Sequence, residues 1–180
     1  MKIQEQGTAE LQPLAEKLRG QRTAMFTMRE FSGELGSRPL TMLEMDRDSA
    51  MWAMVSQKSM GPHFAQAPGA SDARLINLTF SDHGKSLYVS IYGRATLVDD
   101  QARKDELWTA MARPWFSGAD DPDLTLLRIV PLKAEAWDGP NSTVLRLLAI
   151  AASVAAGKEI GLGEHEVFIP GSTTEMPMSV

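Results

Sequence analysis

The first regular hydrophobic pattern in the chain runs over residues 9–19. Its apolar residues recur every three or four positions, which is the spacing of one helix face: Leu11, Leu14, Ala15 and Leu18. Gly20 follows directly and is a typical stop signal. The pattern predicts an amphipathic N-terminal helix within residues 1–22, packed on a sheet.

From residue 23 the pattern changes to short apolar or alternating runs, each bounded by Gly, Ser or Asp. These runs are typical of consecutive antiparallel strands. In the fifth run, Tyr88, Ser90 and Tyr92 alternate with Val89 and Ile91, so one strand face is polar and the other apolar. The five runs are TAMFTM (23–28), RPLTMLEMD (38–46), MWAMVS (51–56), ARLINLTFSD (73–82) and SLYVSIYGRATLVD (86–99).

The sequence predicts a few helices between and after these runs. Residues 57–72 are rich in Gly, Pro and Ala, which favours a short helix at most, followed by an irregular loop. Residues 101–113 have a helical pattern, and Asp100 can cap it. We expect a last strand pair over 124–137, then a helix that Asn141 or Ser142 can cap and that ends at Gly157.

Short strands at close spacing with flanking helices predict a mainly β fold, a small closed or half-closed barrel of antiparallel strands with helices packed outside it. The pattern divides the chain into an N-terminal helix (1–22), one barrel domain that includes the C-terminal helix (23–158) and an irregular tail (159–180). The sequence has no internal repeat and no linker that would separate a second domain.

Composition removes several classes of function. The 180 residues include no cysteine, which excludes disulfides, thiolate catalysis and cysteine-based metal centres. The three histidines are scattered, so we expect no metal site. A net charge of −5 argues against nucleic acid as a partner. No signal peptide is evident and the apolar run over 145–157 is too short for a membrane span, so we expect a cytoplasmic protein without a membrane partner.

Several longer stretches resemble the general stress protein group of the pyridoxamine phosphate oxidase-like, FMN-binding split-barrel superfamily. The resemblance covers about residues 23–158. Its most specific parts are YVSIYGRATLVDD (88–100), the segment WFSGADDPDLTLL (115–127) and AEAWD (134–138). SRPL (37–40), MWAMVSQKS (51–59) and RLINLTFSD (74–82) follow the same order as in the family.

The resemblance implies a flavoprotein that is a homodimer, with FMN as the cofactor in a groove at the two-fold interface. Arg38 corresponds to the arginine that reaches the flavin, with Ser37 and Pro39 beside it. A planar guanidinium can form two parallel hydrogen bonds to a phosphate or a carbonyl. Both subunits contribute to each site, so a single chain holds half of it.

The resemblance also assigns the phosphate to a segment whose cofactor-binding residues are Val55, Ser56, Lys58 and Ser59. This segment departs from the family pattern, because Val55 stands where relatives usually have a threonine and extra residues precede Arg74. Further contacts implied for the flavin come from three aromatic residues, with the two tryptophans reaching it from the second subunit: Tyr88, Trp115 and Trp137.

Three functions fit this resemblance. The first is an FMN-dependent oxidoreductase that passes electrons between a reduced nicotinamide and a small acceptor. The second is a non-enzymatic flavin-binding or flavin-sensing stress protein. The third, suggested by the altered segment 55–63, is a dimeric barrel that has lost FMN and binds another planar ligand. In the first case the flavin carries the chemistry, so no protein-borne catalytic residue is expected.

Overall fold

A computed structural model of the chain describes residues 1–7, 11–30, 32–65, 73–139 and 164–170. The helices are α1 (Gln12–Lys17), α2 (Gln57–Ala65), α3 (Gln101–Leu107) and the 3-10 turn η2 (Ala110–Ala112). The strands are β1 (Lys2–Ile3), β2 (Thr23–Arg29), β3 (Leu35–Met45), β4 (Met51–Ser56), β5 (Arg74–Asp82), β6 (Leu87–Val98), β7 (Leu124–Asp138) and β8 (Glu164–Phe168). Among these helices, none has the length and hydropathy needed to cross a bilayer.

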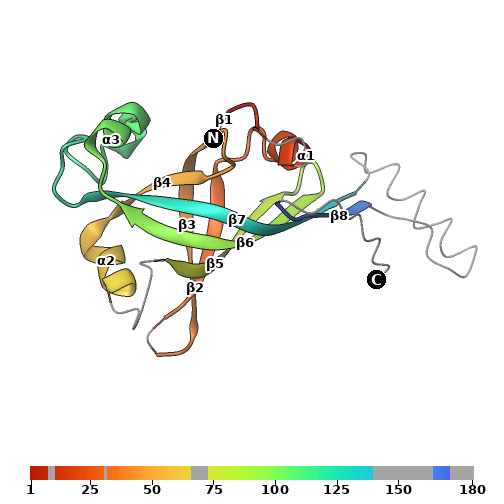
Figure 1. The fold of residues 1–180 in the computed structure, drawn as a ribbon, viewed down its shortest axis with the longest axis horizontal. Helices are drawn as coiled ribbons and strands as arrows, with labels where there is room; N and C mark the ends of the chain where they lie inside the picture. Colours follow the sequence, from red (N-terminus) through yellow and green to blue (C-terminus); the bar gives the residue numbers. More distant parts are fainter. Residues whose placement is uncertain (8–10, 31, 66–72, 140–163, 171–180) are drawn as a thin grey trace, which may run out of the picture.

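Six strands close into an antiparallel barrel in the order β3-β2-β5-β6-β7-β4, and pairing between β3 and β4 completes the ring. The expected split-barrel fold is confirmed. The short β1 extends the sheet beside β3 in parallel, and β8 adds to the outside of β7. Figure 1 shows α3 and α2 near one end of the barrel, with α1 and β8 toward the other.

Alternation of apolar and polar residues explains why these segments form barrel strands. In β5 and β6 every second side chain is buried, and the residues between them face outward. Val89 and Ile91 are fully buried, whereas Tyr88 and Tyr92 are exposed as the pattern predicts. Leu14 of α1 and the leucines that flank the helix, Leu11 and Leu18, join the same core, so this segment closes one part of the barrel with apolar side chains.

Four predictions about secondary structure need correction. Residues 124–138 form one continuous strand rather than a strand pair, because a bulge opposite Gly93 lets β7 pass Pro131 without ending. A side chain at Gly93 would meet the Val130 carbonyl oxygen at 2.7 Å, so the close approach needs glycine. The helix expected over 101–113 ends at Leu107, where Trp108 has extended backbone, and resumes as η2.

The third correction concerns the tail, which was expected to be irregular from residue 159. Residues 164–168 form β8, whose backbone pairs with the exposed edge of β7. The N-terminal helix is also shorter than expected, since α1 covers Gln12–Lys17. The C-terminal helix predicted over 141–157 lies outside the described residues.

Candidate functional site

The barrel opens where β3 and β4 separate. The two strands pair at Met42, Glu44 and Met45 only, close to the turn that joins them. Further from the turn, β3 pairs with β2 on its other side and β4 pairs with β7. The facing edges of β3 and β4 therefore keep backbone N–H and C=O groups without ladder partners, which a ligand between the strands can use.

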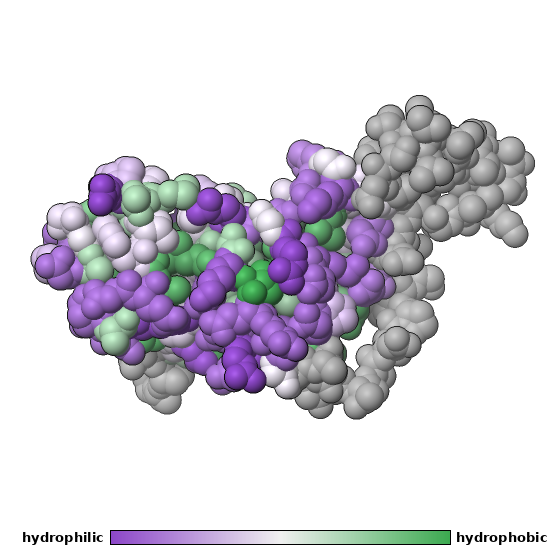
Figure 2. Space-filling view, turned by 90° about the horizontal axis from the view of Figure 1, so that it is seen from above, coloured by the Kyte–Doolittle hydropathy of each residue, from purple (hydrophilic) through white to green (hydrophobic). Residues whose placement is uncertain are grey.

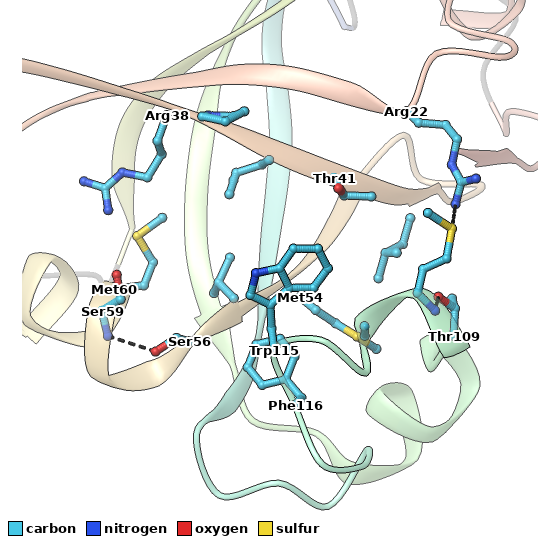
Figure 3. Close-up of a pocket in the computed structure, with 16 residues that line it drawn as sticks. Arg22, Arg38, Thr41, Met54, Ser56, Ser59, Met60, Thr109, Trp115 and Phe116 are labelled. Atoms are coloured by element: carbon cyan, nitrogen blue, oxygen red, sulfur yellow. Dashed lines mark hydrogen bonds between the residues drawn. The ribbon is translucent and has the colours of Figure 1, made fainter.

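A cavity of about 490 Å³ occupies this opening, and its size is in the usual range for a cofactor site. Strands β3 and β4 form two walls, the start of α2 forms one end, and the segment after α3 covers the front (Figure 3). Most of its surface is apolar. The lining residues are Arg22, Arg38, Pro39, Leu40, Thr41, Leu43, Met54, Val55, Ser56, Ser59, Met60, Thr109, Met111, Ala112, Trp115 and Phe116.

Local hydrogen bonds shape the segment 109–116 that covers the cavity. The Thr109 hydroxyl accepts a hydrogen bond from the Met111 amide at 3.2 Å and so caps η2. The amides of Trp115 and Phe116 both donate to the Ala112 carbonyl at 3.0 Å. Phe116 is buried beneath the segment, whereas 75% of the Trp115 surface is exposed. A tryptophan this exposed at a cavity rim contributes little to the core and can contact a ligand.

Arg38 lies at one end of the cavity, on the same side as the start of α2 (Figure 3). Its guanidinium pairs with Glu30 at 3.0 Å, and both side chains are about one-third exposed. A partly exposed pair of this kind contributes about 0–1 kcal/mol to stability. Arg38 can therefore turn toward an anionic ligand without a large cost to the fold.

Asp123 organises the start of α2. Its carboxylate accepts hydrogen bonds from the Ser56 hydroxyl and from the Lys58 amide, each at 2.8 Å. The Ser59 amide donates in turn to the Ser56 hydroxyl at 3.1 Å. Two hydrogen bonds lower the pKa of Asp123 below its ordinary value. The one from the Lys58 amide has the larger effect, and the one from the Ser56 hydroxyl has the smaller effect. The Asp123 carboxylate thus occupies the Ser56 hydroxyl and the Lys58 amide, two donors in the segment that the resemblance assigned to a phosphate.

The structure brings together six of the ten residues predicted to bind the cofactor. The cavity wall contains Arg38, Pro39, Val55, Ser56, Ser59 and Trp115. Trp115 thus lies on the cavity of its own chain, whereas the sequence placed it on that of the second subunit. Ser37 is not in the wall, and its hydroxyl instead shares a hydrogen bond with Thr27 across the strands at 2.7 Å. Lys58 is exposed, and only its backbone amide takes part in the arrangement at the start of α2.

Tyr88 and Trp137 form a separate exposed group. They face each other across β6 and β7, near the end of these strands that is opposite α3. Trp137 stacks on His165 of β8, with ring centroids 4.9 Å apart and planes 10° apart. Leu126 pairs with the cavity residue Met54 and lies eleven positions before Trp137 along β7, a strand path of about 35 Å. A single chain does not bring this group to its own cavity.

Sequence reasoning missed most of the cavity wall. The sequence assigned no role to Arg22, Thr41, Thr109 or Met111, and they meet only because β2, β3 and η2 surround one opening. The apolar wall residues, such as Met54, read as ordinary core positions in the hydrophobic pattern. A prediction of the pairing between β3 and β4 would have been needed to find them.

Comparisons with known proteins agree with this fold. The model of the family described as pyridoxamine 5'-phosphate oxidase like matches residues 9–161, most of the chain. The chain belongs to this family. General stress protein 26 of Bacillus subtilis (strain 168) is 39% identical over 44 residues, which is 24% of this chain. That match spans only 31% of the relative's length.

Two solved structures of family proteins share the fold. A general stress protein 26 from Jannaschia sp. CCS1 superposes with a TM-score of 0.67 at 22% identity, covering 86% of this chain and 94% of that one. The general stress FMN/FAD binding protein of Xanthomonas citri gives a TM-score of 0.55 at 22% identity, covering 96% and 98%. At these identities the likeness extends to the fold alone.

Proposed function

We propose that the protein binds FMN in the cavity between β3 and β4, with the phosphate at the Arg38 end. The observation that carries this proposal is the joint position of Arg38 and Trp115 on one mainly apolar cavity of about 490 Å³. A flavin needs an apolar slot for its ring system and a cation for its phosphate, and these residues supply both. The FMN/FAD-binding relative from Xanthomonas citri supports the same ligand class.

The residues present fit this cofactor in three ways. The unpaired edges of β3 and β4 offer backbone donors and acceptors to the polar edge of the ring. Trp115 offers a flat, exposed face. Ser59 and Arg38 remain for the phosphate, although Asp123 already accepts hydrogen bonds from Ser56 and from the Lys58 amide. We therefore expect an affinity in the micromolar range.

The proposal includes a homodimer that completes the site. Tyr88 and Trp137 are 44% and 37% exposed and lie far from the cavity of their own chain, which suits contact with the flavin of a partner subunit. Large apolar side chains are also exposed on several barrel strands: Met25, Leu35, Leu75 and Tyr92. Figure 2 shows a group of exposed hydrophobic residues within a mostly hydrophilic face. Exposed apolar patches mark contact surfaces.

A bound flavin would supply redox chemistry that no side chain of the protein provides. We propose electron transfer between a reduced nicotinamide and a small acceptor as the activity. The role of the chain in this proposal is to orient the ring between β3 and β4, to shield it with Trp115 and to hold its phosphate. Oxidation of NADH or NADPH by the FMN-loaded protein tests this activity. If neither nicotinamide is oxidised, the oxidoreductase proposal fails and the protein is a flavin-binding protein without this activity.

Titration with FMN, FAD and riboflavin tests the binding itself, read by the visible spectrum and by quenching of flavin fluorescence. Arg38→Ala should weaken FMN binding by about 1.5–3 kcal/mol, roughly ten- to a hundredfold. Arg38→Lys should restore part of the loss, because a point charge cannot reproduce the planar fork. Arg47→Ala is the matched control, since Arg47 is exposed in the turn between β3 and β4.

Two results would contradict the proposal. One is equal affinity of wild type for riboflavin and FMN, which would mean that no phosphate is held. The other is unchanged FMN binding by Arg38→Ala. Light scattering tests the dimer, which should have twice the 19.7 kDa mass of the chain. A monomer that binds FMN as tightly as the dimer would refute the shared site.

A further inference from the structure

Met111 lies on the segment 109–116 that covers the front of the cavity. Its thioether sulfur accepts a hydrogen bond from the guanidinium of Arg22, with 3.0 Å between the two atoms (Figure 3). The other hydrogen bonds of this segment lie within it, such as the one that caps η2 at Thr109. In the described part of the chain, the contact between Arg22 and Met111 is therefore the only hydrogen bond that joins this segment to the barrel.

This hydrogen bond joins a well-placed donor to a poor acceptor. Arg22 directly precedes β2, and its carbonyl accepts a hydrogen bond from the Met42 amide at 2.7 Å, which fixes its backbone beside β3. None of the ion pairs among the described residues involves Arg22, so no carboxylate competes for its guanidinium. A thioether sulfur accepts hydrogen bonds only weakly. A stronger acceptor at the Met111 sulfur would hold the segment more firmly.

Met111 is also the most accessible methionine in the part of the chain that the structure describes. Its surface is 56% exposed, against 42% for Met25. Five other methionines are buried: Met28, Met42, Met45, Met51 and Met60. An exposed thioether is open to oxidation, and its product, methionine sulfoxide, carries a polar oxygen on the sulfur.

We propose that Met111 is a site of oxidation by hydrogen peroxide or an organic hydroperoxide, and that its sulfoxide binds Arg22 and holds the segment 109–116 on the barrel. The sulfur attacks the terminal oxygen of the peroxide, so that an S–O bond forms and the O–O bond breaks. The departing oxygen takes the proton and leaves as water or an alcohol. The sulfur loses two electrons, which reduce the peroxide. A charge-assisted hydrogen bond to oxygen then replaces the weak one to sulfur.

Oxidation of Met111 should therefore tighten the segment. A sulfoxide at a buried methionine has the opposite effect, because it places a polar group in the core and loosens the packing. Met111 is exposed, so little packing is lost. A firmer cover should slow the passage of a ligand into and out of the cavity. This consequence for the flavin rests on the proposed function, whereas the oxidation and the tightening do not.

Hydrogen exchange read by mass spectrometry measures the tightening, on the full chain without added flavin, before and after treatment with hydrogen peroxide. Peptide mapping locates the sulfoxide, which should form at Met111 before any of the five buried methionines. After oxidation the amides of the segment, including those of Trp115 and Phe116, should exchange about tenfold more slowly. Unchanged or faster exchange would overturn the proposal.

Variants of the two partners test the mechanism. Met111→Leu should show no slowing after peroxide, and Met25→Leu, the matched control, should show all of it. Arg22→Ala should still form the sulfoxide but without the slowing, and Arg22→Lys should keep part of it. Slowing that persists in Arg22→Ala or in Met111→Leu would contradict the proposal.

Two further measurements keep the test independent of side effects of peroxide. Met111→Gln places an amide oxygen near the sulfur position without an oxidant and should reproduce part of the slowing. The two methionine sulfoxide reductases, one for each sulfoxide epimer, should reverse the effect in oxidised wild type. Slowing that the reductases do not reverse would refute the sulfoxide as its cause. Thermal melting checks that all variants fold.

The rate of FMN release connects the segment to the cavity. Oxidised wild type should release FMN several-fold more slowly than untreated protein, and oxidised Met111→Leu should release it at the untreated rate. Slower exchange of the segment with unchanged FMN release would overturn its role as a cover. If the protein binds no FMN at all, the proposed function fails, and the exchange measurements still decide whether oxidised Met111 binds Arg22.

Discussion

Strands β3 and β4 meet in two different ways along their length. Near their turn they pair directly, and Glu44 between them is completely buried. Its carboxylate accepts hydrogen bonds from Gln4 and Lys2, each at 2.8 Å, and from Arg103 of α3. The chain itself supplies a partner for each oxygen of this buried charge.

Away from the turn the same strands separate, and the charged groups between them are arginines with few partners. Arg38 has one partly exposed carboxylate, and Arg22 has a thioether. A buried charge without partners would destabilise the fold, so Glu44 requires its three donors. The arginines lie at an open cavity, where water satisfies them until a ligand takes its place. Glu44 is thus a charge that stabilises the barrel, whereas Arg38 and Arg22 are charges that are available for binding.

Helix α3 connects the two regions. Arg103 binds Glu44, and its guanidinium lies over the Trp52 ring, 4.8 Å from the centroid. Trp52 itself is buried and donates to Asp46 at 2.7 Å. Because α3 leads directly into the segment 109–116, the Glu44 contacts also anchor the segment that covers the cavity.

The largest loss of stability is expected from Glu44→Gln, in the region where β3 and β4 pair. The substitution keeps the shape but leaves Arg103 without its buried carboxylate, and we expect a loss of about 3 kcal/mol in the free energy of unfolding. Chemical denaturation at pH 7 measures it. Glu5→Gln is the matched control, since Glu5 is exposed in the same N-terminal region and should change stability by less than about 0.5 kcal/mol. A small effect at Glu44 would mean that its partners rearrange freely.

Acid should remove the same contribution. Burial alone would raise the pKa of Glu44, but the hydrogen bonds from Gln4, Lys2 and Arg103 outweigh it, so the pKa lies below its ordinary value. As the pH falls, Glu44 is therefore protonated at a higher pH in the unfolded chain than in the folded protein. The carboxylate stabilises the fold above its unfolded-state pKa, and the stabilisation is lost as the pH falls through the lower folded-state pKa. The stability gap between wild type and Glu44→Gln should therefore narrow in acid, and a constant gap would refute this.

A smaller effect is expected at the end of β4 that lies away from the turn, where Asp123 caps α2. Asp123→Ala removes the acceptor for the Lys58 amide and the Ser56 hydroxyl, and should lower stability by about 1–2 kcal/mol. Thermal unfolding measures the change. Asp120→Ala is the control, because Asp120 is exposed in the same loop. Equal effects of the two substitutions would show that the cap contributes no stability.

The smallest effect on stability is expected at the cavity rim. Trp115→Leu should change the free energy of unfolding by less than about 0.5 kcal/mol, because the ring is largely exposed. The same variant should weaken FMN binding by about 0.5–1.5 kcal/mol if the ring stacks on the flavin. Trp115→Phe should retain most of the affinity. A large loss of stability with unchanged binding would place Trp115 with the fold rather than the ligand.

Local sequence patterns predicted the barrel strands well because burial on one face requires alternation. The Asp100 cap of α3 also follows from local chemistry, and it is confirmed. The strand pair expected over 124–137 was wrong, since Pro131 reads as a break unless the bulge opposite Gly93 is known. β8 was missed because its strand character depends on the free edge of β7.

The site divides in the same way. The sequence by itself determined the strand pattern, the absence of cysteine chemistry and, through the family resemblance, Arg38 and its neighbours. Only the tertiary structure decided that β3 separates from β4 over the residues before Met42, that Asp123 takes the donors at the start of α2, and that Arg22 joins the cavity. The physical reason is that each of these features depends on contacts between segments far apart in the chain, for which neither hydrophobic periodicity nor a local motif carries a signal.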